Sequence, residues 1–180
     1  AAFVSGGKIE TDFLASFPHQ DTQDQSLAWA SIAKDLSSSS PMDRLVCGDV
    51  GFGKTELAIR AAFRVVLGGM RVVVIAPTTI LTNQLFTAFY SRLNPFAINV
   101  EMVSRFRSKK EVMGVQKKII SGDNDVLVGT HAILNNDIFL NNMGLLIIDE
   151  EHRFGVKNKE RVRGHGSGVD VLSLSATPIP

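Results

Sequence analysis

Short apolar runs rich in β-branched residues recur along the chain and alternate with stretches of helical spacing. Six runs have strand character: 45–47, 72–76, 98–103, 126–128, 145–148 and 169–174. Four helical patterns lie between or beside them: 54–67, 80–93, 108–120 and a shorter one at 156–162. Because the runs are continuous and do not alternate with polar residues, they are typical of parallel strands covered on both faces. We therefore expect an α/β fold of three layers with a mainly parallel central sheet.

A run of serines that ends at Pro41 divides the chain into a lead segment, 1–41, and a lobe, 42–180. Within the lead segment, Thr22 is placed to cap a helix that continues to Leu36. The 180 residues suffice for one buried core, and no apolar run reaches the roughly 18–20 residues that span a bilayer. Cys47 is the only cysteine, which excludes an internal disulfide and favours a reducing, cytoplasmic setting. An organelle copy would have the same composition.

The turn that follows the first strand of the lobe matches the phosphate-binding pattern G-x-x-x-x-G-K-[ST]. Its residues are Gly48, Asp49, Val50, Gly51, Phe52, Gly53, Lys54 and Thr55. The glycines let backbone N–H groups face phosphate oxygens, and the helix that begins near Lys54 adds its positive end. Lys54 supplies a charge for the β- and γ-phosphates, and the Thr55 hydroxyl can bind Mg²⁺. The alternative is a glycine-rich turn with an exposed lysine.

The apolar strand at 145–148 ends in Asp149, Glu150, Glu151 and His152. Carboxylates at the end of a buried strand are costly unless a cation balances their charge. A Mg²⁺ ion held between Asp149 and the phosphates would do so, and Glu150 would then orient and deprotonate the attacking water. The alternative is a solvated acidic turn, and the phosphate-loop pattern earlier in the chain favours the metal site over it. A nucleoside triphosphate, ATP, and Mg²⁺ are the expected ligands.

Several further motifs resemble those of superfamily 2 helicases and translocases, and all occur in the order that this superfamily has. The motifs are Asp149-Glu150-Glu151-His152, Ala76-Pro77-Thr78-Thr79, Gly129-Thr130-His131 and Ser175-Ala176-Thr177, together with Phe17, Thr22 and Gln25 in the lead segment. The resemblance implies a RecA-like P-loop NTPase lobe. It implies catalytic roles for Lys54, Asp149, Glu150 and His152, and adenine contacts from Phe17, Thr22 and Gln25. It also implies a coupling role for Ser175, Ala176 and Thr177.

Three stretches are similar to the family of bacterial transcription-repair coupling factors: 42–56, 104–108 and 149–156. The first extends the implied nucleotide site to Glu56. The resemblance implies a motor that moves along double-stranded DNA, displaces stalled RNA polymerase and helps to recruit excision-repair proteins. The related fork-remodelling helicases of the RecG type are the alternative, although they typically have Ser at position 52 and Gln at position 151.

The resemblance also implies a group of DNA-binding residues: Pro77, Thr78, Thr79, Arg105, Gly129, Thr130 and His131. Hydroxyls and backbone N–H groups at strand ends and helix starts suit phosphate oxygens and carry no sequence information. Two alternatives stay open, because Thr78 and Thr79 can simply cap a helix and His131 can be a core or capping residue. We expect Lys109, Lys110, Lys117 and Lys118 to form solvated helix faces, and we leave them outside the DNA site.

The sequence ends after the motif at 175–177, so we expect the second RecA-like lobe and its arginine finger to belong to a larger protein. Without that finger, the isolated lobe should bind ATP weakly and hydrolyse it poorly, since such a finger is worth about 10³–10⁵ in rate in GTPases. A different class also stays open: a non-catalytic module whose surface is ordered by a nucleotide.

Overall fold

The computed structural model describes residues 2–48, 53–149, 160, 162 and 168–176. The lead segment contains two helices, α1 (Lys8–Ala15) and α2 (Gln23–Ser37). The lobe alternates strands with helices as follows: β1 (Asp43–Cys47), α3 (Lys54–Leu67), β2 (Arg71–Ala76), α4 (Thr79–Leu93), β3 (Val100–Val103), α5 (Lys109–Ser121), β4 (Val126–Thr130), β5 (Met143–Asp149) and β6 (Asp170–Ser175). Two 3₁₀ turns, η1 (Asn94–Phe96) and η2 (His131–Asn135), follow α4 and β4.

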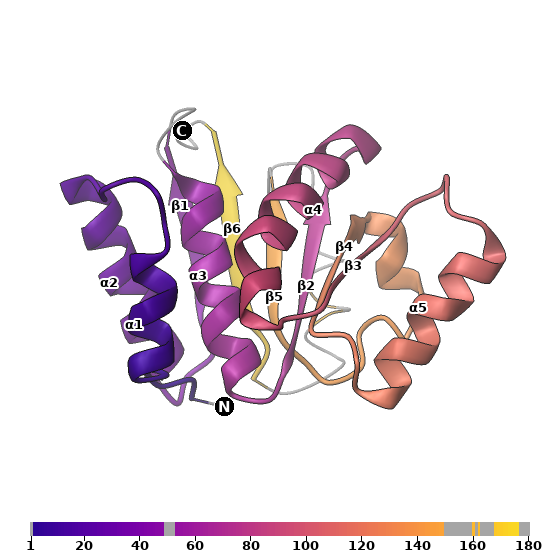
Figure 1. The fold of residues 1–180 in the computed structure, drawn as a ribbon, viewed down its shortest axis with the longest axis horizontal. Coiled ribbons are helices and arrows are strands. Elements are labelled where there is room, and N and C mark those ends of the chain that lie inside the picture. The colour runs from indigo at the N-terminus through magenta and orange to yellow at the C-terminus, as the bar shows by residue number, and fades with distance from the viewer. Residues whose placement is uncertain (1, 49–52, 150–159, 161, 163–167, 177–180) are drawn as a thin grey trace.

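The described strands form one sheet in the order β1-β6-β5-β2-β4-β3, and every neighbouring pair is parallel. All six strands therefore end at the same edge of the sheet (Figure 1). In a parallel sheet this carboxyl edge is where ligands bind. The expectation of a mainly parallel sheet is confirmed.

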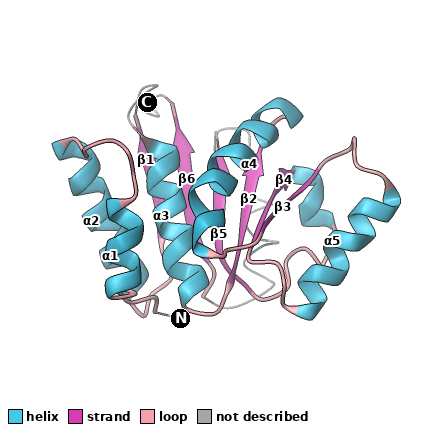
Figure 2. Cartoon of the chain, viewed as in Figure 1, coloured by secondary structure: helices cyan, strands magenta, loops and turns pink. Residues whose placement is uncertain are grey.

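Helices and loops cover both faces of the sheet and make the three layers. Successive residues of β2 point to opposite sides, so that Val72 and Val74 join one apolar core and Val73 and Ile75 join the other. The first core includes α3 and α4, which lie in front of the strands in Figure 2, and the second includes Val115 of α5. None of the described helices is long and apolar enough to cross a membrane.

The lead segment packs on the outer side of α3 through stacked aromatic rings and buried ion pairs. Phe13 of α1 stacks on Phe63 of α3 with ring centroids 4.0 Å apart and the ring planes 4° from parallel. Arg64 of α3 donates from Nε and Nη2 to the two carboxylate oxygens of Glu10 at 2.8 Å. These contacts join 1–41 to the lobe as one packed unit.

The structure differs from the sequence-based expectations at a few boundaries. Helix α1 was not expected, because it is short and its N-cap, Gly7, makes no side-chain capping hydrogen bond. β3 begins at Val100, two residues after the predicted start at Ile98. The short helix predicted at 156–162 falls almost wholly outside the described residues.

Two buried charges lie at the opposite, amino-terminal edge of the sheet. Arg71, at the start of β2, donates to the carbonyl oxygens of Phe139 and Asn141 at 2.9 and 2.7 Å and to Oδ1 of Asn124 at 2.9 Å. Asp170, at the start of β6, accepts from the backbone N–H of Met42 at 2.6 Å through Oδ1, and its Oδ2 has no hydrogen-bond partner among the described residues. Burial lowers the pKa of Arg71 to about 10 and raises that of Asp170 to about 6.

Candidate nucleotide and nucleic-acid site

The predicted phosphate loop and acidic strand end lie at the carboxyl edge on β1 and β5, the two strands that flank β6. Gly48 follows β1, Ser175 ends β6 and Asp149 ends β5, and these three strands are adjacent in the sheet. The backbone N–H of Gly48 donates to the carbonyl oxygen of Ser175 at 3.1 Å. Asp149 is in register with Leu174, the residue before Ser175. The edge thus brings together the start of the predicted phosphate loop, the end of β6 and the predicted metal ligand Asp149.

Helix α3 begins where the phosphate-loop pattern places its helix. Gly53 is the N-cap and has a left-handed backbone with φ of 81°, which favours glycine. Lys54 and Thr55 form the first turn, and Nζ of Lys54 donates to the carbonyl oxygen of Gly48 at 2.7 Å. The lysine therefore reaches back across the loop toward the strand end. Asp49, Val50, Gly51 and Phe52, which were also predicted to bind phosphate, lie outside the described residues.

Two of the predicted adenine-site residues form the start of α2. Thr22 Oγ1 accepts from the backbone N–H of Gln25 at 3.1 Å, and the backbone N–H of Thr22 donates to Oε1 of Gln25 at 2.8 Å. This reciprocal capping box confirms Thr22 as the helix N-cap. The Gln25 side chain also lies against the phosphate loop, because a Cβ built on Gly53 would be 1.9 Å from its Nε2.

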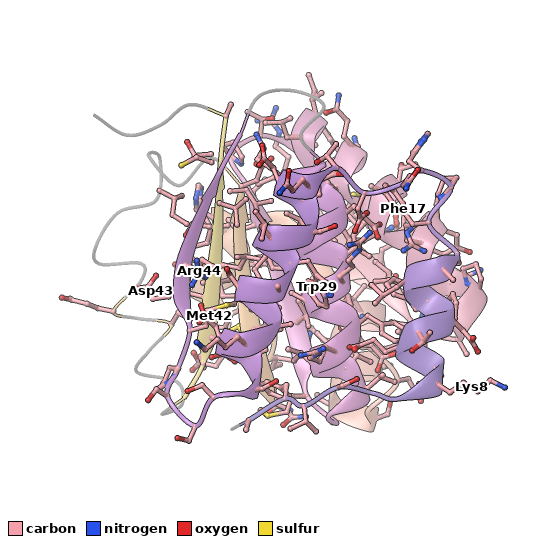
Figure 3. All side chains as sticks on the ribbon, turned by 90° about the vertical axis from the view of Figure 1, so that its left-hand side faces the viewer. Lys8, Phe17, Trp29, Met42, Asp43 and Arg44 are labelled. Atoms are coloured by element: carbon pink, nitrogen blue, oxygen red, sulfur yellow. The ribbon has the colours of Figure 1, made fainter. Side chains whose placement is uncertain are left out.

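Phe17, the third predicted adenine contact, is half-buried in the loop between α1 and α2 (Figure 3). The guanidinium carbon of Arg60 lies 5.4 Å from the centre of its ring, and that of Arg92 lies 5.6 Å away. Neither arginine was singled out from the sequence. Arg60 could have been noticed, because a charged residue within the apolar pattern of 57–65 needs a buried partner.

Glu56, which was included in the implied nucleotide site, accepts hydrogen bonds from these same two arginines through its carboxylate. Oε2 accepts from Nε of Arg60 at 2.8 Å, and Oε1 accepts from Nε of Arg92 at 2.7 Å. The Glu56 side chain is only 7% exposed. Any contact of Glu56 with a nucleotide would therefore be made by its backbone and not by its side chain.

The acidic and coupling motifs are described only in part. Asp149 is half-buried at the end of β5, Ser175 is buried and Ala176 is exposed. Glu150, His152 and Thr177 lie outside the described residues. The described part of the chain contains no cluster of three or more His, Cys, Asp or Glu side chains arranged to hold a metal ion. Of the predicted metal ligands, Thr55 and Asp149 provide one hydroxyl and one carboxylate, which are oxygen donors of the kind that Mg²⁺ prefers.

The predicted DNA-binding residues gather on the other half of the same edge, after β2, β4 and β3. A cavity of about 450 Å³ is lined by Pro77, Thr78, Thr79, Arg105, Thr130, His131 and Ala132. Six of the seven predicted residues therefore line one cavity. The seventh, Gly129, has a packing role, because a Cβ built there would lie 2.8 Å from Cγ2 of Ile133 and 3.0 Å from the carbonyl oxygen of Val103.

The polar groups of this cavity are compatible with DNA-phosphate contact and also with the alternatives, a capping role for Thr78 and a core or capping role for His131. Oγ1 of Thr78 accepts from the backbone N–H of Leu81 at 3.2 Å, which confirms the N-cap of α4. The hydroxyl proton of Thr78 can still be donated to a phosphate oxygen. Burial lowers the pKa of His131, which favours a neutral ring. Phe106, which was not predicted, is 74% exposed and lies with its ring centre 5.0 Å from the guanidinium of Arg105. The sequence signal for Phe106 was its place between Arg105 and Arg107 in a polar loop, where an aromatic side chain is expected to be exposed.

Comparison with known proteins assigns the chain to a family. The profile of DEAD/DEAH box helicases matches residues 22–180. The chain belongs to the DEAD/DEAH box helicase family. The match begins at Thr22, so this helicase domain includes part of the lead segment. Membership implies nucleotide binding.

The helicase domain is similar to parts of much longer proteins. It is 45% identical over 179 residues to a transcription-repair-coupling factor of Bacillus subtilis, covering 99% of this chain and 15% of that protein. It is 46% identical over 168 residues to the coupling factor of Haemophilus influenzae, covering 93% of this chain and 15% of that protein. A structure of RecG bound to a three-way DNA junction has a TM-score of 0.85 and 35% identity, covering 99% of this chain and 24% of that one. The chain therefore spans about a seventh of the curated relatives that it matches.

A solved structure of Mycobacterium smegmatis Lhr, bound to single-stranded DNA and AMP-PNP, has a TM-score of 0.72 at 18% identity and covers 96% of this chain and 25% of that one. At this identity the likeness concerns the fold alone. It agrees with a RecA-like arrangement of the parallel sheet.

Proposed function

We propose that this chain is the ATP-binding motor lobe of a double-stranded DNA translocase of the transcription-repair coupling type. One observation carries the proposal: the residues predicted to bind nucleotide and those predicted to bind DNA occupy two adjoining halves of a single sheet edge. The phosphate loop follows β1 and Asp149 ends β5, whereas the cavity with Thr78, Arg105 and His131 follows β2, β3 and β4. Because β5 and β2 are neighbours, the nucleotide half adjoins the DNA half on the same rigid element.

The nucleotide half has the donors that ATP and Mg²⁺ require. Lys54 and the start of α3 would hold the phosphates, and Thr55 with Asp149 would hold the metal. Mg²⁺ would neutralise charge on the phosphate oxygens. Glu150 would orient and deprotonate the attacking water, and His152 would relay the state of the nucleotide to a neighbouring element. Phe17, Thr22 and Gln25 would contact the adenine.

The DNA half would contact the phosphate backbone. Hydroxyl groups, a helix start and Arg105 position a duplex without reading its bases, as a motor that moves over any sequence requires. Ser175 accepts a hydrogen bond from the start of the phosphate loop, so the motif at 175–177 is suited to respond to the state of the nucleotide.

The identity of the larger protein is proposed from its relatives. The coupling factors at 45–47% identity support a protein that displaces stalled RNA polymerase and leads to excision repair in the bacterial cytoplasm. The likeness to RecG supports fork remodelling as the second candidate. In either protein, a second RecA-like lobe would complete the ATP site, so the isolated lobe should turn over ATP poorly.

The proposed function is tested by substituting Glu150→Gln in the full-length protein. We expect ATP to bind as in the wild type while ATP hydrolysis and displacement of a stalled RNA polymerase from duplex DNA are lost. The amide keeps the size of the side chain and removes its basicity, so binding and chemistry are separated. The measurements are equilibrium binding of ATP and single-turnover displacement.

Two outcomes would contradict this proposal in different ways. Unchanged displacement in the Glu150→Gln protein would favour a non-catalytic module whose surface the nucleotide only orders. ATP-dependent processing of branched DNA, with no effect on a stalled polymerase, would favour the fork-remodelling relative.

A further inference from the structure

Two arginines from different helices meet at one aromatic ring of the lead segment. Arg60 lies in α3 and Arg92 lies near the end of α4, and both guanidinium groups are within 6 Å of the centre of the Phe17 ring. Both side chains are mostly buried, with 4% and 14% exposed. A cation placed over an aromatic face at this distance is attracted to it. The position of Phe17 is therefore set by the helices of the lobe as well as by the lead segment, and Arg92 also lies 4.2 Å from the centre of the Phe13 ring.

Hydrogen bonds fix each arginine in orientation. Arg60 donates from Nη1 and Nη2 to the two oxygens of Asp21 at 2.8 Å, which is a bidentate pair. This pair lowers the pKa of Asp21. Arg92 donates to Ser16 Oγ at 2.7 Å and to the carbonyl oxygen of Phe13 at 3.3 Å. Asp21 and Ser16 both belong to the segment around Phe17, so the two arginines hold that segment at both ends.

Glu56 connects the two arginines to the phosphate-binding helix. Its carboxylate accepts from Arg60 and, through both oxygens, from Arg92 at 2.7 and 2.8 Å. It directly follows Lys54 and Thr55 in the first turn of α3. A displacement of this turn would therefore move the Glu56 carboxylate, the guanidinium groups of Arg60 and Arg92 that are hydrogen-bonded to it, and the Phe17 ring that they contact.

We propose that Arg60 and Arg92 are positioning residues that hold Phe17 for contact with the nucleotide base, and that Glu56 ties this base site to the helix carrying Lys54 and Thr55. This inference rests on the proposed nucleotide site and adds what determines its preference for a base. Without the two arginines, the half-buried Phe17 ring would lose the charges that hold it in place. The phosphates would still find Lys54 and the start of α3.

The competing explanation is that the arginines only dock the lead segment on the lobe. Arg64, one turn after Arg60, provides a matched control for that explanation. It makes a bidentate pair with Glu10, donates to the carbonyl oxygen of Ala33 at 3.1 Å, and lies 5.3 Å from the centre of the Trp29 ring. Arg64 thus docks the same segment through the same kinds of contact. Its aromatic partner, however, is Trp29 within α2, which lies below Phe17 in Figure 3.

The experiment compares Arg60→Gln, Arg92→Gln and Arg64→Gln in the 180-residue chain. Three probes are titrated with Mg²⁺: a non-hydrolysable ATP analogue, the corresponding GTP analogue, and tripolyphosphate, which has no base. We define the base preference as the affinity for either nucleotide analogue divided by that for tripolyphosphate, because an aromatic ring can stack on any base. We expect this preference to fall about tenfold in Arg60→Gln and Arg92→Gln, the scale of one base–aromatic stacking contact. Tripolyphosphate should bind these two variants as it binds the wild type, and Arg64→Gln should keep the wild-type preference.

The inference is overturned if Arg64→Gln loses the preference as fully as the other two, or if Arg60→Gln and Arg92→Gln keep it. It is also overturned if the wild type binds tripolyphosphate as tightly as it binds either analogue. By contrast, failure of wild-type protein to bind tripolyphosphate and both analogues would refute the proposed nucleotide site itself. Should the arginine variants not fold, as judged by thermal unfolding, Glu56→Gln retains both arginines and should still reduce the preference. An unchanged preference in that variant would overturn the inference.

Discussion

The backbone N–H of Gly48 donates to the carbonyl oxygen of Ser175 at 3.1 Å, which joins the start of the phosphate loop to the end of β6. β6 lies between β1 and β5, so this hydrogen bond stands next to the strand that ends in Asp149. The strand carrying the proposed coupling motif therefore separates, and touches, the strands carrying the phosphate loop and the proposed metal ligand. In the proposed site, a movement of the phosphate loop would therefore act directly on Ser175 through this hydrogen bond.

Replacing Lys54 should abolish most nucleotide binding without unfolding the chain. Lys54→Ala removes a charge whose Nζ already points back over the loop to Gly48. A hydrogen bond to a charged group is worth about 1.5–3 kcal/mol, so we expect affinity for the ATP analogue to fall roughly tenfold to a hundredfold. Calorimetric titration measures the loss. Lys8→Ala, at an exposed lysine that points away from the lobe in Figure 3, is the control and should bind as the wild type does.

Replacing Arg105 should weaken DNA binding in a salt-dependent manner. Arg105→Ala removes the one arginine among the described residues that line the cavity. We expect lower affinity for duplex DNA and a decrease of about 1 in the slope of log K against log salt concentration, as for the loss of one phosphate contact. Fluorescence anisotropy at several salt concentrations provides the slope. An equal effect of Lys110→Ala, an exposed residue of α5 that does not line the cavity, would argue against a localised site.

Arg71 should be a major determinant of stability at the amino-terminal edge of the sheet. Arg71→Met leaves the carbonyl oxygens of Phe139 and Asn141 and the side-chain oxygen of Asn124 without this donor. Asn141 is exposed, so water can replace the donor at its carbonyl oxygen. At about 1–3 kcal/mol for each of the two buried acceptors, on Phe139 and Asn124, the free energy of unfolding should fall by at least about 2 kcal/mol in urea denaturation. Arg44→Ala breaks a pair with Asp35 that is 39% and 30% exposed, and it should cost no more than about 1 kcal/mol. Similar losses in the two variants would contradict the assignment.

Asp170 should make the chain less stable as the pH rises. Burial raises the pKa of its carboxyl group from 3.8 to about 6. The folded state therefore binds this proton more tightly than the unfolded state. The resulting stabilisation is complete below about pH 4 and is lost as the pH rises through about 6, a change on the order of 3 kcal/mol.

The variant Asp170→Asn isolates this contribution, because the amide oxygen can still accept from the N–H of Met42. We expect the variant to be more stable than the wild type at pH 7 and the difference to shrink toward pH 4. Urea denaturation across this range measures both. Parallel pH profiles for the two proteins would exclude Asp170 as the titrating group.

Local physical chemistry explains why much of the fold could be predicted. The six apolar runs, the N-caps Thr22 and Thr78 and the helix start at Lys54 depend on residues that are close in sequence. Backbone hydrogen bonding and side-chain periodicity act over that range. α1 was missed for the same reason, since its N-cap glycine gives no local side-chain signal.

By itself the sequence determined the alternation of strands and helices, the turn that matches a phosphate-binding pattern and the residue types at each strand end. Only the tertiary structure decided which strand ends are neighbours, because the order β1-β6-β5-β2-β4-β3 depends on pairing between segments far apart in the chain. That order places Gly48 beside Ser175 and brings Thr78, Arg105 and His131 to one cavity. The packing of α3 against α4 and the lead segment also brought the Glu56 carboxylate into hydrogen-bonding distance of Arg60 and Arg92. A buried charge must find its partners in three dimensions, and adjacency in sequence does not reveal them.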